Sequence, residues 1–190
     1  TDRVIETLRS CMGAIPGGID TDQQLPMTIP LRHFVVGLGF LIAGSILGIG
    51  VVADAIPGLG RLAHIHLLLV GWVCVTIMGA MTQFVPVWSG VALHSRRLAS
   101  LQLTLVVAGL VGFGVALLSG RLAWLPVVSA ILLAGFWVFV YNVGRTLGAI
   151  DAFDVTERHF ALALGFFLVL TVLGYALAVD FTVPLFERLG

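Results

Sequence analysis

RLAHIHLLLVGWVCVTIMGAMTQFVPVWSG, residues 61–90, carries no charged side chain after its first residue. A helix rises about 1.5 Å per residue, so about 20 apolar residues cross the roughly 30 Å of hydrocarbon in a bilayer. Inside that layer the backbone polar groups must bond to one another, which a helix achieves within a single segment. The stretch therefore predicts a transmembrane helix over about 62–88.

Four further stretches have the same character, and Gly, Pro and charged residues separate them. They lie at about 33–56, 98–119, 122–144 and 159–180. The whole chain of 190 residues is 59% hydrophobic and only 11% charged, with a mean hydropathy of +1.09. These values exclude a water-soluble globular domain. The sequence predicts an all-α integral membrane protein with five transmembrane helices, which form a bundle over residues 31–190.

Residues 1–30 differ from the rest of the chain. In TDRVIETLRSCMG the apolar side chains fall on one helical stripe, which predicts a short amphipathic helix at the membrane interface. The following AIPGGIDTDQQLPMTIP is rich in Pro, Gly and Asp and is typical of a surface linker. Before the fifth span, DVTER at 154–158 offers Thr156 as a helix N-cap.

Charge predicts orientation and excludes one class of partner. The ten basic residues are all Arg and balance ten acidic ones, so the chain has no large positive field for nucleic acid. By the positive-inside rule the side with more arginines faces the cytoplasm. Seven arginines fall on the side of the N-terminus (3, 9, 32, 96, 97, 145 and 158) and three on the other (61, 121 and 188). We expect a cytoplasmic N-terminus, an outside C-terminus and lipid around the helices.

The five histidines separate by depth. His33, His94 and His159 lie near the cytoplasmic ends of spans, where we expect them to face headgroups or water. His64 and His66 begin the second span, and an imidazole one turn inside hydrocarbon needs a polar partner or a metal. Side chains two residues apart on a helix point in directions about 200° apart around its axis. The two imidazoles therefore face different neighbours and cannot share one metal.

Helical geometry places small residues below His64. Gly71 and Gly79 lie on its face, which leaves room for a flat macrocycle edge-on to the helix. We interpret His64 as the first candidate heme ligand and His66 as the second, with Gly71 and Gly79 against the cofactor and Arg61 pairing with a propionate. The alternatives are helix packing for the glycines, hydrogen bonding for the histidines and interfacial anchoring for Arg61.

The same span resembles the second transmembrane helix of the catalytic subunits of heme-copper oxidases and nitric oxide reductases. The resemblance lies in His64-x-His66-Leu67, Trp72, Met78-Gly79-Ala80 and Phe84-Val85-Pro86. It implies that the helix begins at the outer face and that its first histidine is an axial ligand of a b-type heme. The distance from His64 to Trp72 and to Met78 is one residue longer than in nitric oxide reductases.

The resemblance does not extend to a complete active site. The family's copper-ligating histidines and its second heme ligand are not recognisable, so copper and catalytic residues are not expected. The resemblance implies a heme b protein of the inner or plasma membrane, at most an electron-transfer or O2/NO-handling component. It would be a homo-oligomer or a subunit of a larger respiratory complex. The alternative is a non-catalytic structural or assembly subunit that keeps the helix and has no cofactor.

Overall fold

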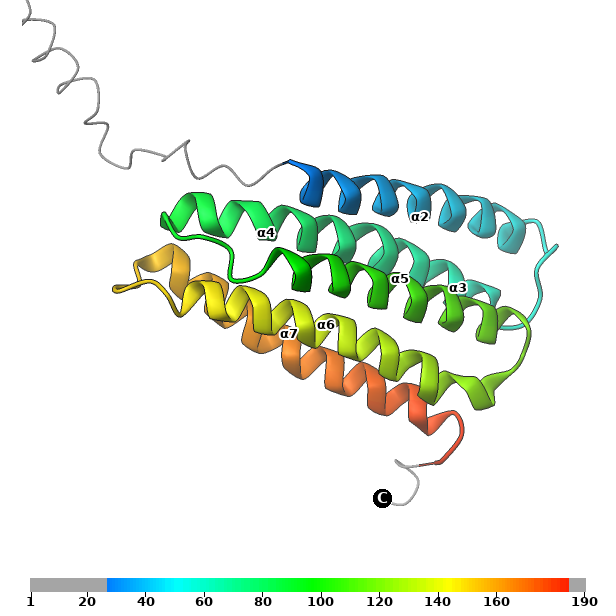
Figure 1. The fold of residues 1–190 in the computed structure, drawn as a ribbon. Helices are drawn as coiled ribbons and strands as arrows, with labels where there is room; N and C mark the ends of the chain where they lie inside the picture. The colour runs from blue at the N-terminus through cyan, green and yellow to red at the C-terminus, as the bar shows by residue number, and fades with distance from the viewer. Residues whose placement is uncertain (1–26, 185–190) are drawn as a thin grey trace, which may run out of the picture.

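The computed structural model describes residues 27–184, and all their regular elements are helices (Figure 1). Five of these helices are long and apolar enough to cross a membrane: Thr28–Val52, Gly60–Ser89, Arg96–Leu118, Leu122–Leu147 and Val155–Asp180. The all-α fold with five spanning helices is thus confirmed. The amphipathic segment predicted near the N-terminus lies outside the described residues.

The second span is composite. It runs through α3 (Gly60–His66), a π-helix η2 (Leu67–Cys74) and α4 (Val75–Ser89), and Gly90 ends it with a φ of 64°. Pro86 lies inside α4, so the helix continues past the Phe84-Val85-Pro86 sequence. The other spans are α2 (Thr28–Val52), α5 (Arg96–Leu118), the 3-10 turn η3 (Leu122–Trp124) with α6 (Leu125–Leu147), and α7 (Val155–Asp180).

The helices alternate in direction, so the bundle has two ends (Figure 1). We call them the His33 end, where α2, α5 and α7 begin, and the His64 end, where the second span and α6 begin. The second span packs against α2 on one side and against α5 and α6 on the other, and α7 packs mainly against α6. Much of α2 and α7 is uncovered: Val52 is 85% exposed and Phe166 is 68% exposed. Such apolar surfaces suit lipid contact.

An extensive interface joins α5 to α6. It depends on glycines, because a Cβ on Gly109 would lie 2.6 Å from the backbone nitrogen of Leu132, and one on Gly135 would lie 2.9 Å from that of Val106. A side chain at either position would push the two backbones apart. These two glycines therefore allow the close packing of α5 against α6.

A polar clasp holds the His33 end together. The Asn142 side chain on α6 accepts a hydrogen bond from the Ser95 N–H and donates one to the Ser95 carbonyl, both at 2.9 Å. Thr146 adds a hydroxyl acceptor for the backbone N–H of His94 at 3.0 Å. Together these bonds fix the 90–95 connection against α6, and Ser95 in turn caps α5 by accepting from the Leu98 N–H.

The fifth span begins earlier than expected, and its N-cap is Asp154. The Asp154 carboxylate accepts from the backbone N–H groups of Thr156 and Glu157, and the Glu157 carboxylate accepts from the Asp154 N–H. This reciprocal pair is a capping box. The prediction of Thr156 as the cap was wrong, because only Asp154 stands three residues before a Glu able to complete the box. Glu157 also accepts from the Ser89 hydroxyl, which ties α7 to the end of α4.

Candidate functional site

The two histidines of the second span lie on opposite faces of it, as their spacing predicted. His64 faces α2. Its Nδ1–H donates to the backbone carbonyl of Gly44 across the helix interface at 2.7 Å. The ring lies close against Gly48, where a Cβ would be 2.5 Å from Cε1 of the imidazole. His64 thus joins α2 to α3 by a hydrogen bond and by close packing.

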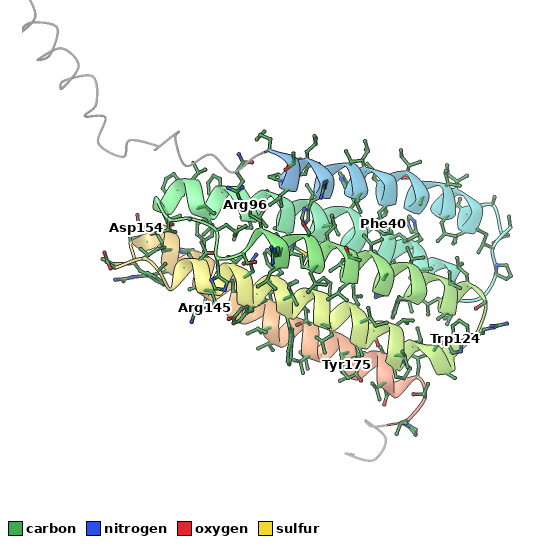
Figure 2. All side chains as sticks on the ribbon, viewed as in Figure 1. Phe40, Arg96, Trp124, Arg145, Asp154 and Tyr175 are labelled. Atoms are coloured by element: carbon green, nitrogen blue, oxygen red, sulfur yellow. The ribbon has the colours of Figure 1, made fainter. Side chains whose placement is uncertain are left out.

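The small residues below His64 also face α2, which fills the space beside them. A Cβ on Gly71 would lie 2.5 Å from Cγ of Phe40, and one on Gly79 would collide with Cβ of His33. Figure 2 labels Phe40 on α2, beside the second span. A macrocycle on this face would have to displace α2. Here Gly71 and Gly79 serve helix packing, the alternative that the sequence left open.

His66 faces the other way, into an apolar cavity of about 240 Å³ between the second span, α5, α6 and α7. Its Nδ1–H donates to the Leu62 carbonyl one turn earlier at 2.8 Å. The imidazole lies against Phe113 of α5, with ring centroids 4.7 Å apart. Phe136 of α6 and Phe167 of α7 form further walls. The Phe136 and Phe167 rings meet edge to face, with their centroids 5.1 Å apart.

The cavity offers few free polar groups. The Ser129 hydroxyl bonds to the Leu125 carbonyl, and the Thr171 hydroxyl bonds to the Leu168 carbonyl at 2.9 Å. Both hydroxyls are therefore turned toward their own helices. The Nδ1–H bond of His66 leaves its Nε2 as the nitrogen with an available lone pair. The cavity thus combines aromatic walls with one imidazole able to act as a ligand.

The π-helix η2 begins directly after His66 and lines the cavity through Val70 and Cys74. π-helical turns within α-helices occur frequently at functional sites, because they re-aim side chains without breaking the helix. On α7, Gly174 and Tyr175 border the cavity. Figure 2 labels Tyr175 toward the His64 end of that helix. A Cβ on Gly174 would meet no atom within 4 Å, so this position borders open space.

Arg61 is exposed on the first turn of α3 and does not line the cavity. Of the three histidines expected at headgroups or water, His94 and His159 are exposed. The expectation for His33 was wrong: it is only 1% exposed, its Nδ1–H donates to the Ile29 carbonyl at 2.8 Å, and its Nε2 lies 3.2 Å from the Gln102 amide nitrogen.

Comparison with known proteins does not identify this site. No family model matches the chain, and no curated protein or solved structure is significantly similar to it. Within residues 27–184, no three His, Cys, Asp or Glu side chains gather closely enough to hold a metal ion.

The sequence did not reveal two features of the site. The cavity is built from four helices, and its aromatic walls come from positions that are apolar in any membrane span. The His33–Gln102 pair joins residues 69 positions apart. Gln102 offered the available signal for that pair, because an amide inside an apolar span needs a polar partner.

Proposed function

We propose that the chain binds a b-type heme in the cavity beside His66, with that imidazole as axial ligand, and that it handles a diatomic gas or transfers electrons. The observation that carries the proposal is the apolar, aromatic-walled cavity that contains one imidazole. The sequence favoured His64, which borders a hollow of about 450 Å³ with five residues of the first span and its end: Ser45, Gly48, Ile49, Val52 and Ala53. That hollow is open to the outside and has no aromatic wall, whereas the smaller cavity beside His66 is enclosed by four helices.

His66 is held as a heme ligand would be held. Ligating histidines commonly donate their other ring N–H to a backbone carbonyl, which sets the tautomer and orients the ring. The bond from Nδ1 to Leu62 does this for His66. The same i to i−4 bond occurs at His33 and His159, so the bond alone does not distinguish His66. The adjoining cavity does, and its apolar walls would exclude water from the bound group.

Heme can fit into the cavity beside His66 only if α7 moves. A volume of 240 Å³ lies just below the roughly 300 to 1,000 Å³ of small-molecule sites. Since α7 packs mainly against α6, the side between α7 and the second span is the one that can widen. Gly174 borders open space there and allows close approach of a planar group. We propose entry of the macrocycle from the lipid along this side.

The cavity suits a heme with one axial histidine, which can bind a gas, better than a heme held by two histidines. Among the described residues that line it, no second histidine and no methionine is present. Heme in proteins is also held by Cys or Tyr side chains, and Cys74 and Tyr175 line the cavity as well. With His66 as the one axial protein ligand, the iron would keep a position for a diatomic molecule. His66 would therefore supply the sole imidazole, and the phenyl rings would shape the opposite face.

The π-helix accounts for the spacing that departs from nitric oxide reductases. One extra residue between His64 and Trp72 cannot fit into a regular α-helix without rotating everything beyond it by about 100°. A π-helical segment absorbs such a residue, and η2 begins between these two positions and includes Trp72. This supports a relationship to the second helix of heme-copper oxidase catalytic subunits.

We further propose that the His64 end faces outward and the His33 end faces the cytoplasm of an inner or plasma membrane. The support is the distribution of arginines, of which the described residues include Arg32, Arg96, Arg97 and Arg145 at the His33 end. The uncovered faces of α2 and α7 are available for lipid, for further copies of the chain or for other subunits of a respiratory complex.

The test is hemin titration of the purified chain in detergent, read by the reduced-minus-oxidised spectrum. Wild type should give a Soret and an α band at about one heme per chain. His66→Ala should abolish the bands, whereas the matched variant His64→Ala should retain them. Loss of the bands in His64→Ala together with their retention in His66→Ala would refute the assignment.

The second candidate is a structural or assembly subunit without its own cofactor. The observation that favours it is the hydrogen bond between His64 and Gly44, with α2 packed against Gly71 and Gly79, because α2 occupies the space that a macrocycle below His64 would need. A folded wild-type chain that shows no heme bands after saturation with hemin would establish this candidate and end the first.

A further inference from the structure

We propose a second site, independent of the heme proposal: a groove between α2 and α5 at the His33 end that binds one phospholipid with a net negative headgroup. Two adjoining hollows form the groove. The first, about 200 Å³, is lined by Ile29, Arg32, His33, Ser100, Leu103 and Thr104. The second, about 360 Å³, is lined by Leu31, Arg32, Val35, Val36 and Leu103.

The groove exists because α2 and α5 touch only slightly. Both pack against the second span, which lies between them and leaves a furrow on one side. Arg32 and Leu103 border both hollows, so the two are continuous. The floor of the first hollow is rigid, because His33 is almost fully buried and bonded on both ring nitrogens.

The two hollows differ in chemistry, as the two parts of a lipid do. The first has a guanidinium from Arg32 and the hydroxyls of Ser100 and Thr104, which are exposed. A guanidinium binds a phosphate through paired hydrogen bonds. The two hydroxyls donate to the Arg96 and Ser100 carbonyls of their own helix, so they make the hollow polar but leave Arg32 as its donor to the phosphate. The second hollow is apolar apart from Arg32 and suits an acyl chain.

Charge around the groove selects an anionic headgroup. Arg96 lies on the same stripe of α5 as Ser100 and Thr104, since these positions are four residues apart. Figure 2 labels Arg96 at the His33 end of the bundle. Neither hollow is lined by a carboxylate that would pair with the ammonium of a zwitterionic lipid. Phosphatidylglycerol meets these requirements, whereas phosphatidylcholine does not.

The experiment is native mass spectrometry of the delipidated chain, titrated with phosphatidylglycerol or phosphatidylcholine of identical acyl chains. Wild type should retain one phosphatidylglycerol in preference to phosphatidylcholine. Arg32→Gln should lose affinity for it roughly tenfold, the size of one charge-assisted hydrogen bond. The matched control is Arg145→Gln, which removes an exposed arginine from the same end but away from the groove and should bind like wild type.

Two further measurements test whether the whole lipid binds, rather than its phosphate alone. Val35→Asn places an amide in the acyl hollow at a 63% exposed position, and it should weaken phosphatidylglycerol binding without lowering the Tm. Inorganic phosphate alone should not compete at millimolar concentration. Equal losses in Arg32→Gln and Arg145→Gln would show diffuse attraction and overturn the site. Competition by free phosphate, or unchanged binding by Val35→Asn, would overturn the lipid as its ligand.

Discussion

Substitution of three glycines of α5, Gly109, Gly112 and Gly114, tests how closely α5 packs against α6 beside the cavity. In Gly109→Ala the new methyl would lie 2.6 Å from the backbone nitrogen of Leu132, and backbone cannot rotate away as a side chain can. In Gly112→Ala the methyl meets Cγ1 of Val128 at 2.8 Å, a side-chain atom. In Gly114→Ala the methyl meets nothing within 4 Å.

The magnitudes follow from these contacts. Overpacking a close interface lowers the free energy of unfolding by about 1 to 3 kcal/mol. Replacing Gly by Ala inside a helix raises it by about 0.5 to 1 kcal/mol, because Ala loses less backbone entropy on folding. We expect Gly109→Ala to lower the free energy of unfolding by about 1 to 2 kcal/mol. Gly112→Ala should lower it by less than about 1 kcal/mol, because Val128 can shift. Gly114→Ala should raise it by about 0.5 to 1 kcal/mol.

The assay is unfolding in mixed micelles of dodecyl maltoside and SDS, followed by helical circular dichroism, with all three variants purified alike. The order of stability should be Gly114→Ala, wild type, Gly112→Ala, Gly109→Ala. If Gly109→Ala were as stable as Gly114→Ala, α5 and α6 would not approach at backbone distance, and the cavity between them and α7 would have a different shape.

Three further predictions concern the ends of the bundle. Asn142→Ala strands the N–H and carbonyl of Ser95, so the free energy of unfolding should fall by about 1 to 3 kcal/mol in the same SDS titration; an unchanged value would mean that the clasp is not formed. Gly48→Ala forces the His64 ring away and should lower the Tm in a thermal melt while leaving hemin binding intact, and loss of hemin binding would count against His66 as ligand. Hydrogen bonding with the Glu157 side chain holds the pKa of the Asp154 carboxyl below its ordinary value, and hydrogen bonds from the backbone N–H groups of Thr156 and Glu157 lower it further. The stabilisation from this cap is therefore present above about pH 4 and lost as the pH falls further, so Asp154→Asn should lower the Tm at about pH 7 and have no effect near pH 2. A Tm difference that persisted in acid would contradict this assignment.

The spanning helices were predictable because each needs only a long apolar run, but their ends required local chemistry. We expected the first span over about 33–56, whereas α2 covers Thr28–Val52. Pro30 fits the first turn of a helix, where its missing N–H costs nothing. Asp54 takes a φ of 53° just beyond the other end, which stops the helix before the apolar run is finished.

The site was only partly predictable. The sequence correctly placed His64 and His66 on opposite faces, since that follows from helical spacing alone. It could not show which face is filled, because the filling residues Phe40 and His33 come from another helix. His33 itself was misjudged, since its burial depends on Gln102 of α5, a partner that no local pattern specifies.

The most direct test of the heme proposal fills the space beside His66 without touching the imidazole. Gly174 lines the cavity and has room for a side chain, so we expect the ring of Gly174→Phe to narrow it. Gly165→Phe places the same ring on α7 at a position that does not line the cavity. Hemin titration of both variants should show loss of the Soret band in Gly174→Phe and wild-type binding in Gly165→Phe. Full heme binding by a folded Gly174→Phe variant would show that the cavity is not the site.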